Sequence, residues 1–532
     1  MLTEILQANH ACEFGRTHGF AGITSPRDPA FAVPLAEYAD FAPHIERMTR
    51  GEQNILTSEP VLLFEPTSGT SAGEKLIPYT PMLRRQFQAA IAVWMHDLLT
   101  KRPALQRGRA YWSISPPLTR GRTTPAGIPI AFDDDQAYLG RFSQWAARRL
   151  SITPRELLQV ADPAEFRQRT LLCLLAAADL TLVSIWNPTF FTTILQPLAE
   201  DWPQLVRELE QGSWPIPTMT RRRRQQRAAQ VRRIMQANES LPEKLHQLWP
   251  QLQLLSCWTD GAASHALPAL RELLPHVEIQ PKGLLATEAF VSIPLLDRPG
   301  AALAIESHFF EFVERNDQHL IEASTPQMTL AADELTLGGH YEVIVTTGGG
   351  LYRYRLHDEI EVVGFENECP LIRFVGKTDL TSDLVGEKLG ASHVEQALDK
   401  LCREFNWQPT FMMLTPHVPP KDEATSPTRY RLYLQLERSN PRLPEFASRL
   451  QTALEANPYY KQAVQLCQLR PLEIALLDPQ CDAAQQHLGR CNALGQRLGN
   501  IKPNLLDRRS GWDECFAPWI VQLVPAMGDS ST

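Results

Sequence analysis

The stretch Glu65-Pro-Thr-Ser-Gly-Thr-Ser-Ala-Gly-Glu-Lys75 carries the strongest local signal in the sequence. It follows the apolar run 61–64 and combines glycines and hydroxyl side chains with one lysine. Backbone N–H groups and hydroxyls can converge on a phosphate where side chains are small, and a lysine adds a positive charge. The stretch therefore predicts a phosphate-binding loop that consists of Thr67, Ser68, Gly69, Thr70, Ser71, Gly73 and Lys75.

This loop differs from a Walker loop, in which four residues separate the glycines and a Ser or Thr follows the lysine. Here three residues separate Gly69 from Gly73, and Leu76 follows Lys75. A flexible surface turn is the alternative interpretation for a loop of this composition taken alone.

The segments that follow the loop predict an α/β fold. Residues 79–102 have helical spacing, and the apolar runs 110–115, 181–186 and 252–258 are typical of buried strands. Strands that alternate with helices favour a substantially parallel sheet flanked by helices. From about 288 to 376, strand-like pieces follow one another directly, which predicts a β-rich, barrel-like part with more antiparallel sheet.

After residue 378 the pattern predicts a smaller α+β domain. Helical spacing covers 391–405 and 443–456, and strand-like runs lie between and after these segments. We expect a large N-terminal domain over 1–378 and a smaller C-terminal domain over 379–532, with the boundary at Thr378 and Asp379.

Composition excludes several classes of protein. The chain has 532 residues and a net charge of −8, which does not favour binding to nucleic acid or to anionic membranes. Its nine cysteines have no CxxC spacing, and no apolar run approaches the length of a membrane span. These features predict a cytoplasmic protein.

The run 221–233 carries seven arginines without interleaved aromatics, so we expect an exposed helix face there, with an anion site as the alternative.

Two further motifs lie downstream, Lys282-Gly-Leu-Leu-Ala-Thr-Glu288 and Tyr352-Arg-Tyr-Arg-Leu-His-Asp358. Each is weak alone. Glu288 could be a surface acid, and Asp358 could pair with Arg353 or Arg355.

Together and in this order, the three motifs resemble those of the adenylate-forming superfamily. More narrowly, they are similar to its Gretchen Hagen, or auxin-responsive-promoter, branch of acyl-acid amido synthetases. In that branch the loop resembles TSGTSxGxxK, the second motif ends in Ser or Thr and Glu, and the third resembles YRxxxGD. The resemblance begins near residue 1 and continues through WNPTF at 186–190, WTDGAAS at 258–264 and GEKL at 386–389.

The resemblance implies that the domain 1–378 is the adenylating domain and that the C-terminal domain 379–532 is mobile and swings about a hinge at Asp379. It also implies a role for each site residue. The loop would hold the phosphates of ATP, Thr287 would contact the α-phosphate, and Glu288 would coordinate Mg²⁺. Asp358 would bind the ribose hydroxyls, and Arg373 is a further ribose or phosphate candidate. Gly261, Ala262 and Ala286 would line the nucleotide site. Lys502 lies where the superfamily keeps its C-terminal catalytic lysine, with Lys388 as the next candidate.

Three positions depart from the family pattern. His357 replaces the usual glycine before Asp358, and Leu284 and Leu285 stand where a tyrosine is common. Pro503 follows Lys502 where an arginine is usual. Trp112, Trp186 and Phe190 could line a pocket for the acid, or they could belong to the core.

The chemistry implied is ATP-dependent activation of a carboxylic acid as acyl-AMP, followed by transfer of the acyl group to an amine, with an amino acid as the family's usual acceptor. An acyl- or aryl-CoA ligase would share the first step and is the alternative enzyme. A non-catalytic binding protein that keeps the fold is the alternative from another class.

Overall fold

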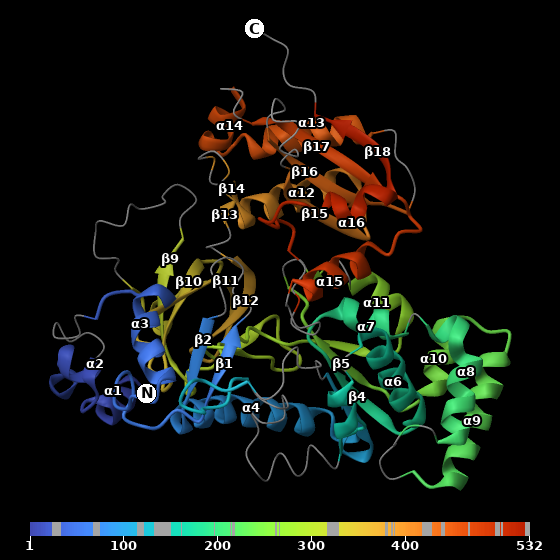
Figure 1. The fold of residues 1–532 in the computed structure, drawn as a ribbon, viewed down its shortest axis with the longest axis horizontal. Coiled ribbons are helices and arrows are strands. Elements are labelled where there is room, and N and C mark those ends of the chain that lie inside the picture. The colour runs from blue at the N-terminus through green and yellow to red at the C-terminus, as the bar shows by residue number, and fades with distance from the viewer. Residues whose placement is uncertain are drawn as a thin grey trace. The chain divides into compact units, whose positions relative to one another are not determined.

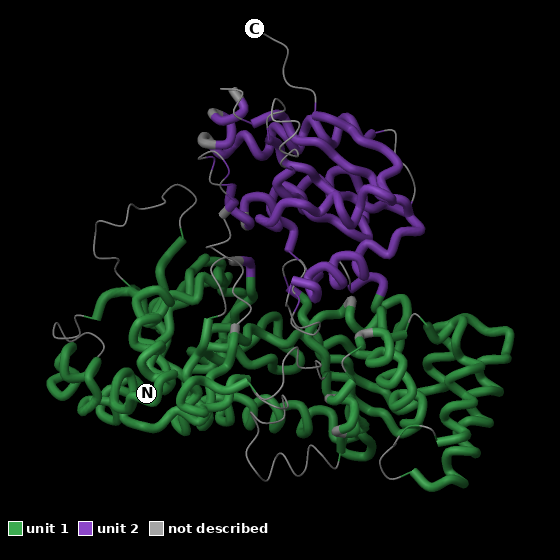
Figure 2. The backbone as a smooth tube through the Cα atoms, viewed as in Figure 1, with its two compact units in different colours: residues 1–259, 270–374 green, residues 260–269, 375–532 purple. Residues whose placement is uncertain are grey.

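The chain forms two compact units, coloured separately in Figure 2. One consists of residues 1–259 and 270–374, here called unit 1, and the other of residues 260–269 and 375–532, here called unit 2. Asp379 lies outside the described residues, so the boundary between the domains 1–378 and 379–532 stays a prediction. This computed structural model describes residues 1–23, 33–67, 75–113, 122–131, 150–160, 162–195, 197–212, 214, 219–260, 263–264, 267–315, 329–377, 381–382, 384, 387, 389–417, 428–437, 442–465, 469–494, 501 and 504–526.

A parallel sheet forms in unit 1, as predicted. Its strands pair in the order β3-β4-β5-β6, and every neighbouring pair is parallel. The carboxyl ends of parallel strands meet at one edge of a sheet. The residues that end these strands therefore lie along the same edge. The strands are β3 (Arg109–Trp112), β4 (Leu180–Ser184), β5 (Leu254–Cys257) and β6 (Glu278–Pro281).

Helix α4 (Pro81–Lys101) contributes side chains to two hydrophobic cores, one beside this parallel sheet and one that includes strands of a second sheet. The Thr80 hydroxyl accepts the backbone N–H of Leu83 at 3.1 Å and caps its first turn, where Pro81 costs no hydrogen bond. Leu83, Phe87 and Trp94 point into one hydrophobic core, while Leu98 belongs to the core beside the parallel sheet.

The second sheet of unit 1 has six strands in the order β7-β8-β12-β11-β10-β9. The pairs β7–β8, β8–β12, β10–β11 and β9–β10 are antiparallel, as the sequence predicts for this region. The strands are β7 (Ser292–Ile293), β8 (Ala301–Leu303), β9 (Phe309–Glu314), β10 (His340–Thr346), β11 (Tyr354–Glu366) and β12 (Cys369–Lys377).

The remaining helices of unit 1 lie at its N-terminus and around the parallel sheet. Figure 1 shows α6, α8, α9 and α10 side by side, and these helices pack on one another. Within the part of the chain that is described, no helix is both long and apolar enough to cross a bilayer. The helices are α1 (Leu2–Asn9), α2 (Glu13–Thr17), α3 (Tyr38–Thr49), α6 (Pro163–Ala176), α7 (Pro188–Leu195), α8 (Leu198–Gln211), α9 (Arg221–Gln236) and α10 (Leu241–Leu248).

The arginine run forms α9, and its first residues 221–223 are exposed, as predicted. Arg227 differs, because it is only 4% exposed. Its guanidinium donates to the carbonyl oxygens of Leu175 and Leu248 at 2.7 Å each, which ties α9 to the ends of α6 and α10. Burial lowers the pKa of Arg227 to about 10. This arginine is therefore structural rather than part of a charged surface.

Unit 2 is an α+β unit around the sheet β15-β16-β17-β18. Alternate residues of β16 face opposite sides: Leu432 and Leu434 pack in one core with α12 and α13, whereas Tyr433 packs in another with α15 and α16. The elements are β13 (Thr381–Ser382), β14 (Leu389–Gly390), α12 (Ala391–Phe405), β15 (Phe411–His417), β16 (Arg429–Gln435), α13 (Leu443–Leu454), α14 (Pro458–Gln465), β17 (Arg470–Leu477), α15 (Ala483–Ala493), α16 (Asp513–Phe516) and β18 (Ile520–Pro525).

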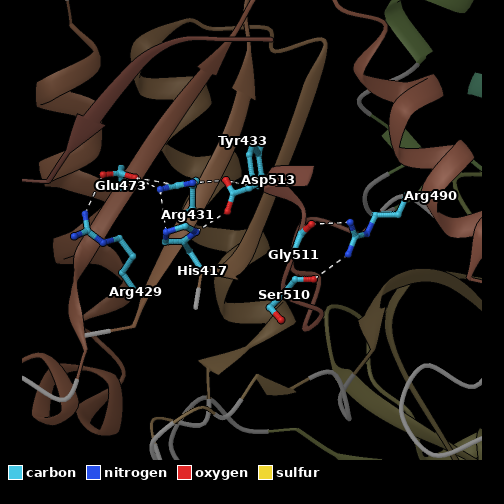
Figure 3. Close-up of polar contacts among 9 residues, drawn as sticks. All are labelled: His417, Arg429, Arg431, Tyr433, Glu473, Arg490, Ser510, Gly511 and Asp513. Atoms are coloured by element: carbon cyan, nitrogen blue, oxygen red, sulfur yellow. Dashed lines mark hydrogen bonds and ion pairs between the residues drawn. The ribbon is translucent and has the colours of Figure 1, made fainter. Parts of the chain in front are cut away.

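A polar network fastens α16 to the sheet of unit 2 (Figure 3). Asp513 accepts a hydrogen bond from the Tyr433 hydroxyl at 2.7 Å, lies 2.7 Å from Nδ1 of His417, and pairs with Arg431. Arg431 also donates to Glu473 on β17 at 2.6 Å. Burial raises the pKa of Asp513, but hydrogen bonds from His417 and Tyr433 and the charge of Arg431 outweigh it and lower that pKa to about 2.

We predict that Asp513→Asn lowers the free energy of unfolding at pH 7 by about 1–2 kcal/mol, after allowance for partial exposure of the carboxylate. Because the folded-state pKa is depressed, this contribution is present above the ordinary pKa of 3.8 and is lost as pH falls towards 2. Urea unfolding of the variant and the wild type at several pH values between 7 and 2.5 measures this difference in the free energy of unfolding. Glu514→Gln, at a side chain that is 82% exposed, is the control and should change little. A difference that persists unchanged at low pH would contradict the assignment.

Candidate nucleotide and acyl site

The predicted phosphate loop lies at the tip of a β-hairpin. Strands β1 (Leu63–Thr67) and β2 (Lys75–Tyr79) pair antiparallel, with Thr67 directly opposite Lys75. The loop residues between them, Ser68, Gly69, Thr70, Ser71 and Gly73 included, lie outside the described residues. The hairpin register thus fixes where the loop begins and ends.

Tyr38 supports the second strand of this hairpin. Its hydroxyl accepts the backbone N–H of Leu76 at 2.8 Å and lies 3.3 Å from the carbonyl oxygen of the same residue. The ammonium of Lys75 lies 5.6 Å from the centre of the Tyr38 ring. A cation over an aromatic face is attracted by the ring quadrupole, so Tyr38 helps to define where Lys75 points.

The second motif forms a tight turn after β6. The backbone N–H of Ala286 donates to the carbonyl oxygen of Ala289 at 3.0 Å, which places Thr287 and Glu288 at the tip. Both tip side chains are half-buried. A turn of this kind holds a hydroxyl and a carboxylate next to each other while leaving both accessible.

The second and third motifs meet in space. The hydroxyl of Tyr354, on β11, donates to Oε1 of Glu288 at 3.4 Å. Tyr354 is itself 3% exposed and is fixed by backbone pairing with Ala36. The structure therefore brings together two motifs that lie 66 residues apart in the sequence.

The two arginines of the third motif hold β11 to its neighbours. Arg353 donates to both oxygens of Glu311 at 3.0 and 2.9 Å, and Arg355 donates to both oxygens of Glu342 at 2.9 and 2.6 Å. The bidentate partners of both arginines are thus glutamates of β9 and β10 rather than Asp358. Asp358 is 1% exposed.

His357 stands in a left-handed backbone conformation, with φ of +57°. Between Arg355 and Glu359 the strand gains residues relative to β10, so the pairing register shifts at this point. The ring of His357 lies 3.5 Å from Glu37 and 3.4 Å from Glu342. At the position where the family pattern has glycine, this left-handed conformation is therefore adopted by a histidine, one of the residue types that adopt positive φ more readily than most.

We predict that His357→Val lowers the free energy of unfolding by about 1–3 kcal/mol more than His357→Gly, because a β-branched residue tolerates positive φ poorly. It should also raise the KM for ATP, since the bulge orients Asp358. Urea unfolding and pyrophosphate-exchange kinetics measure the two effects.

A matched control is Asn367→Val, at an exposed turn with φ of +53°. That variant should lose stability without a change in the KM for ATP. Equal KM values for ATP in the two valine variants would show that the conformation at His357 does not affect nucleotide binding.

The other predicted site residues lie in different surroundings. Arg373, on β12, is half exposed and pairs with Glu361 at 2.5 Å. Trp112 and Trp186 are half-buried at the carboxyl edge of the parallel sheet, whereas Phe190, on α7, is 3% exposed. Four further candidates lie outside the described residues, namely Gly261, Ala262, Lys388 and Lys502.

Among the residues with described positions, no group of three or more His, Cys, Asp or Glu side chains could hold a metal ion by itself. Mg²⁺ is commonly held by one or two carboxylates together with substrate phosphates. An accessible single carboxylate, as at Glu288, fits that mode of binding.

Family models match most of the chain in the expected order. The GH3 family N-terminal domain matches residues 1–279, the central domain 301–377 and the C-terminal domain 392–506. The chain belongs to the GH3 family. The family predicted from the three motifs is therefore confirmed.

Relatives of this GH3 chain are distant in sequence but match most of its length. It is 23% identical to indole-3-acetic acid-amido synthetase GH3.3 of Arabidopsis thaliana, over 90% of this chain and 84% of that protein. It is 24% identical to the probable indole-3-acetic acid-amido synthetase GH3.12 of Oryza sativa subsp. japonica, over 94% of this chain and 89% of that protein.

A solved GH3 structure shares the fold. The acyl acid amido synthetase AtGH3.15 in complex with 2,4-DB is 19% identical and has a TM-score of 0.81, covering 100% of this chain and 94% of that one. The predicted α/β fold class is therefore confirmed.

Proposed function

We propose that this GH3 chain is an ATP-dependent acyl-acid amido synthetase that activates a carboxylic acid as acyl-AMP and transfers the acyl group to an amino acid. The observation that carries the proposal is the match of GH3 models from residue 1 to 506. Relatives that match over a similar span are named indole-3-acetic acid-amido synthetases. The contact between Tyr354 and Glu288 supports it, because it joins two motifs that one nucleotide site would use.

The reaction has two steps. A free carboxylate is a poor acyl donor, because its leaving group would be oxide. One carboxylate oxygen attacks the α-phosphorus of ATP, and pyrophosphate leaves. The amine nitrogen then attacks the acyl carbon, AMP leaves, and the nitrogen loses a proton. No protein nucleophile is needed, so the chain contributes alignment and electrostatic stabilisation.

The residues of unit 1 take distinct roles in the first step. The hairpin loop after Thr67 binds the ATP phosphates, with Lys75 at its end. Glu288 would supply the carboxylate that holds Mg²⁺ together with the phosphates, and the ion would offset negative charge at the α-phosphate. Thr287, beside it on the turn, contacts the α-phosphate, and Asp358 accepts hydrogen bonds from the ribose hydroxyls.

ATP–pyrophosphate exchange with a panel of carboxylic acids tests the proposal. We expect exchange that depends on the acid and, with an added amino acid, release of AMP and an amide. Formation of ADP and phosphate would indicate acyl-phosphate chemistry instead. AMP release that requires CoA rather than an amino acid would favour the acyl-CoA ligase.

We predict that Glu288→Gln lowers the exchange rate by at least about 10²-fold while the protein stays folded, since an amide is a weaker ligand for a hard cation than a carboxylate. The control is Glu314→Gln, which removes an exposed carboxylate of the same unit and should leave the rate unchanged. Near-normal exchange in Glu288→Gln would make Glu288 a surface acid, as the alternative interpretation has it.

We predict that Lys502→Ala slows adenylation by about 10²–10³-fold and slows amide formation from preformed acyl-adenylate much less. The reason is that unit 2 carries Lys502, and rotation about the proposed hinge at Asp379 would withdraw it after the first step. Synthetic acyl-adenylate with amine isolates the second step. Equal losses in both steps would make Lys502 structural, and no loss in either would make Lys388 the next candidate.

A further inference from the structure

His308 is a buried histidine of unit 1 that lies directly before β9. It is 1% exposed, and its Nε2 accepts the backbone N–H of Phe290 at 3.0 Å. Burial lowers the pKa of His308 to about 3, so the imidazole is neutral near pH 7. A neutral imidazole carries one lone pair and one N–H, which places the lone pair on Nε2 and the proton on Nδ1.

The Nδ1 side of this ring is unfavourable for stability. Nδ1 is buried and has no hydrogen-bond partner among the residues that the structure describes. The rings of Phe87 and Phe310 pack edge-on against the imidazole, with centres 5.6 and 6.0 Å from its own. A buried polar group without a partner costs free energy, and an apolar side chain of similar size would avoid that cost. The contact that a histidine adds at this position is therefore the one at Nε2.

The amide of Phe290 needs an acceptor from outside its own hairpin. Phe290 lies opposite Leu285 in an antiparallel bridge, and the backbone N–H groups of Ala286 and Val291 make the hydrogen bonds on either side of it. In such a pair the two residues direct their own N–H and C=O groups away from each other. Phe290 is 4% exposed, and a buried N–H needs a partner. His308 provides it.

This hairpin carries the turn that is proposed to act on the nucleotide. Thr287 and Glu288 lie at its tip, and Phe290 lies on the returning arm, two residues after Glu288. The hydroxyl of Tyr354 reaches Glu288 from β11 at 3.4 Å. His308 holds the returning arm through its backbone. Two separate contacts, one to the carboxylate and one to the backbone behind it, therefore place Glu288.

We propose that His308 is a positioning residue for Glu288: by accepting the Phe290 N–H, it keeps the hairpin in the shape that presents this carboxylate to Mg²⁺. This inference rests on the proposed function and adds to it a residue that acts through another rather than on the reacting groups. The alternative is a purely structural role, in which His308 stabilises unit 1 and leaves binding at the turn unaffected.

Two substitutions of similar size separate the hydrogen bond from the packing. In His308→Gln the side-chain oxygen can accept the Phe290 N–H, whereas in His308→Met the thioether is only a weak acceptor. His308→Met also exchanges one unpaired group for another, because Nδ1 disappears and the N–H of Phe290 loses its partner. Stability alone therefore does not separate the two roles, and the test uses two other readouts.

The first readout is hydrogen–deuterium exchange of the Phe290 amide in the absence of nucleotide, followed by mass spectrometry on overlapping peptides. We expect exchange about fivefold or more faster in His308→Met than in the wild type, because the amide loses its acceptor. In His308→Gln the rate should stay within about twofold of the wild type. His308→Leu is a second variant without an acceptor and should behave as His308→Met does.

The second readout is the affinity for ATP, measured by calorimetry with Mg²⁺ and with EDTA, which requires no acid substrate. We expect the wild type to bind ATP about 10-fold or more tightly with Mg²⁺ than with EDTA. His308→Met should lose most of that gain while its affinity in EDTA stays within about twofold, and His308→Gln should keep the gain.

The matched control is His487→Met, at a histidine of α15 in unit 2. His487 is 7% exposed, and burial lowers its pKa to about 4, so it is also a buried neutral imidazole. This variant should behave as the wild type does in both readouts.

The outcomes separate this role from the proposed function. Variants without an acceptor that keep slow exchange at Phe290, or that keep the gain from Mg²⁺, would overturn the role of His308 alone. Loss of the gain in His308→Gln to the same extent as in His308→Met would overturn it too, because the shape of the ring rather than the hydrogen bond would then matter. A wild type with no gain from Mg²⁺ would instead overturn the proposed role of Glu288, and this inference with it.

Discussion

The pairing of β6 with its neighbour β5 is the constraint on which the candidate site of unit 1 depends. Lys282 follows the last residue of β6, and the turn with Thr287 and Glu288 follows a few residues later. A shift of one residue in strand register turns every side chain to the opposite face. The hydrogen bond from Lys282 to the Cys257 carbonyl, made beyond the end of the strand, secures this register where the site begins.

In the β-rich part of unit 1, ion pairs hold the charged third motif against buried strands. Arg353 and Arg355 each engage a glutamate with both carboxylate oxygens. Fork-shaped contacts of this kind add direction as well as energy. They fix the start of β11, on the N-terminal side of the bulge at His357, so that Tyr354 can reach Glu288 from a rigid strand. The main effect of these ion pairs is to fix the position and direction of the strand.

The sequence predicted the regular elements and the family well and missed what depends on distant pairing. The expected helix at 391–405 is α12, and the parallel and antiparallel regions lie where spacing placed them. Strand β18 went unpredicted, because much of it is exposed and its apolar alternation is weak. The burial of Arg227 was also not predicted, because nothing local in a run of arginines distinguishes the one that enters the core. The contacts of Lys282 with Trp94 and Trp186 join residues far apart in the sequence, which tertiary packing brings together.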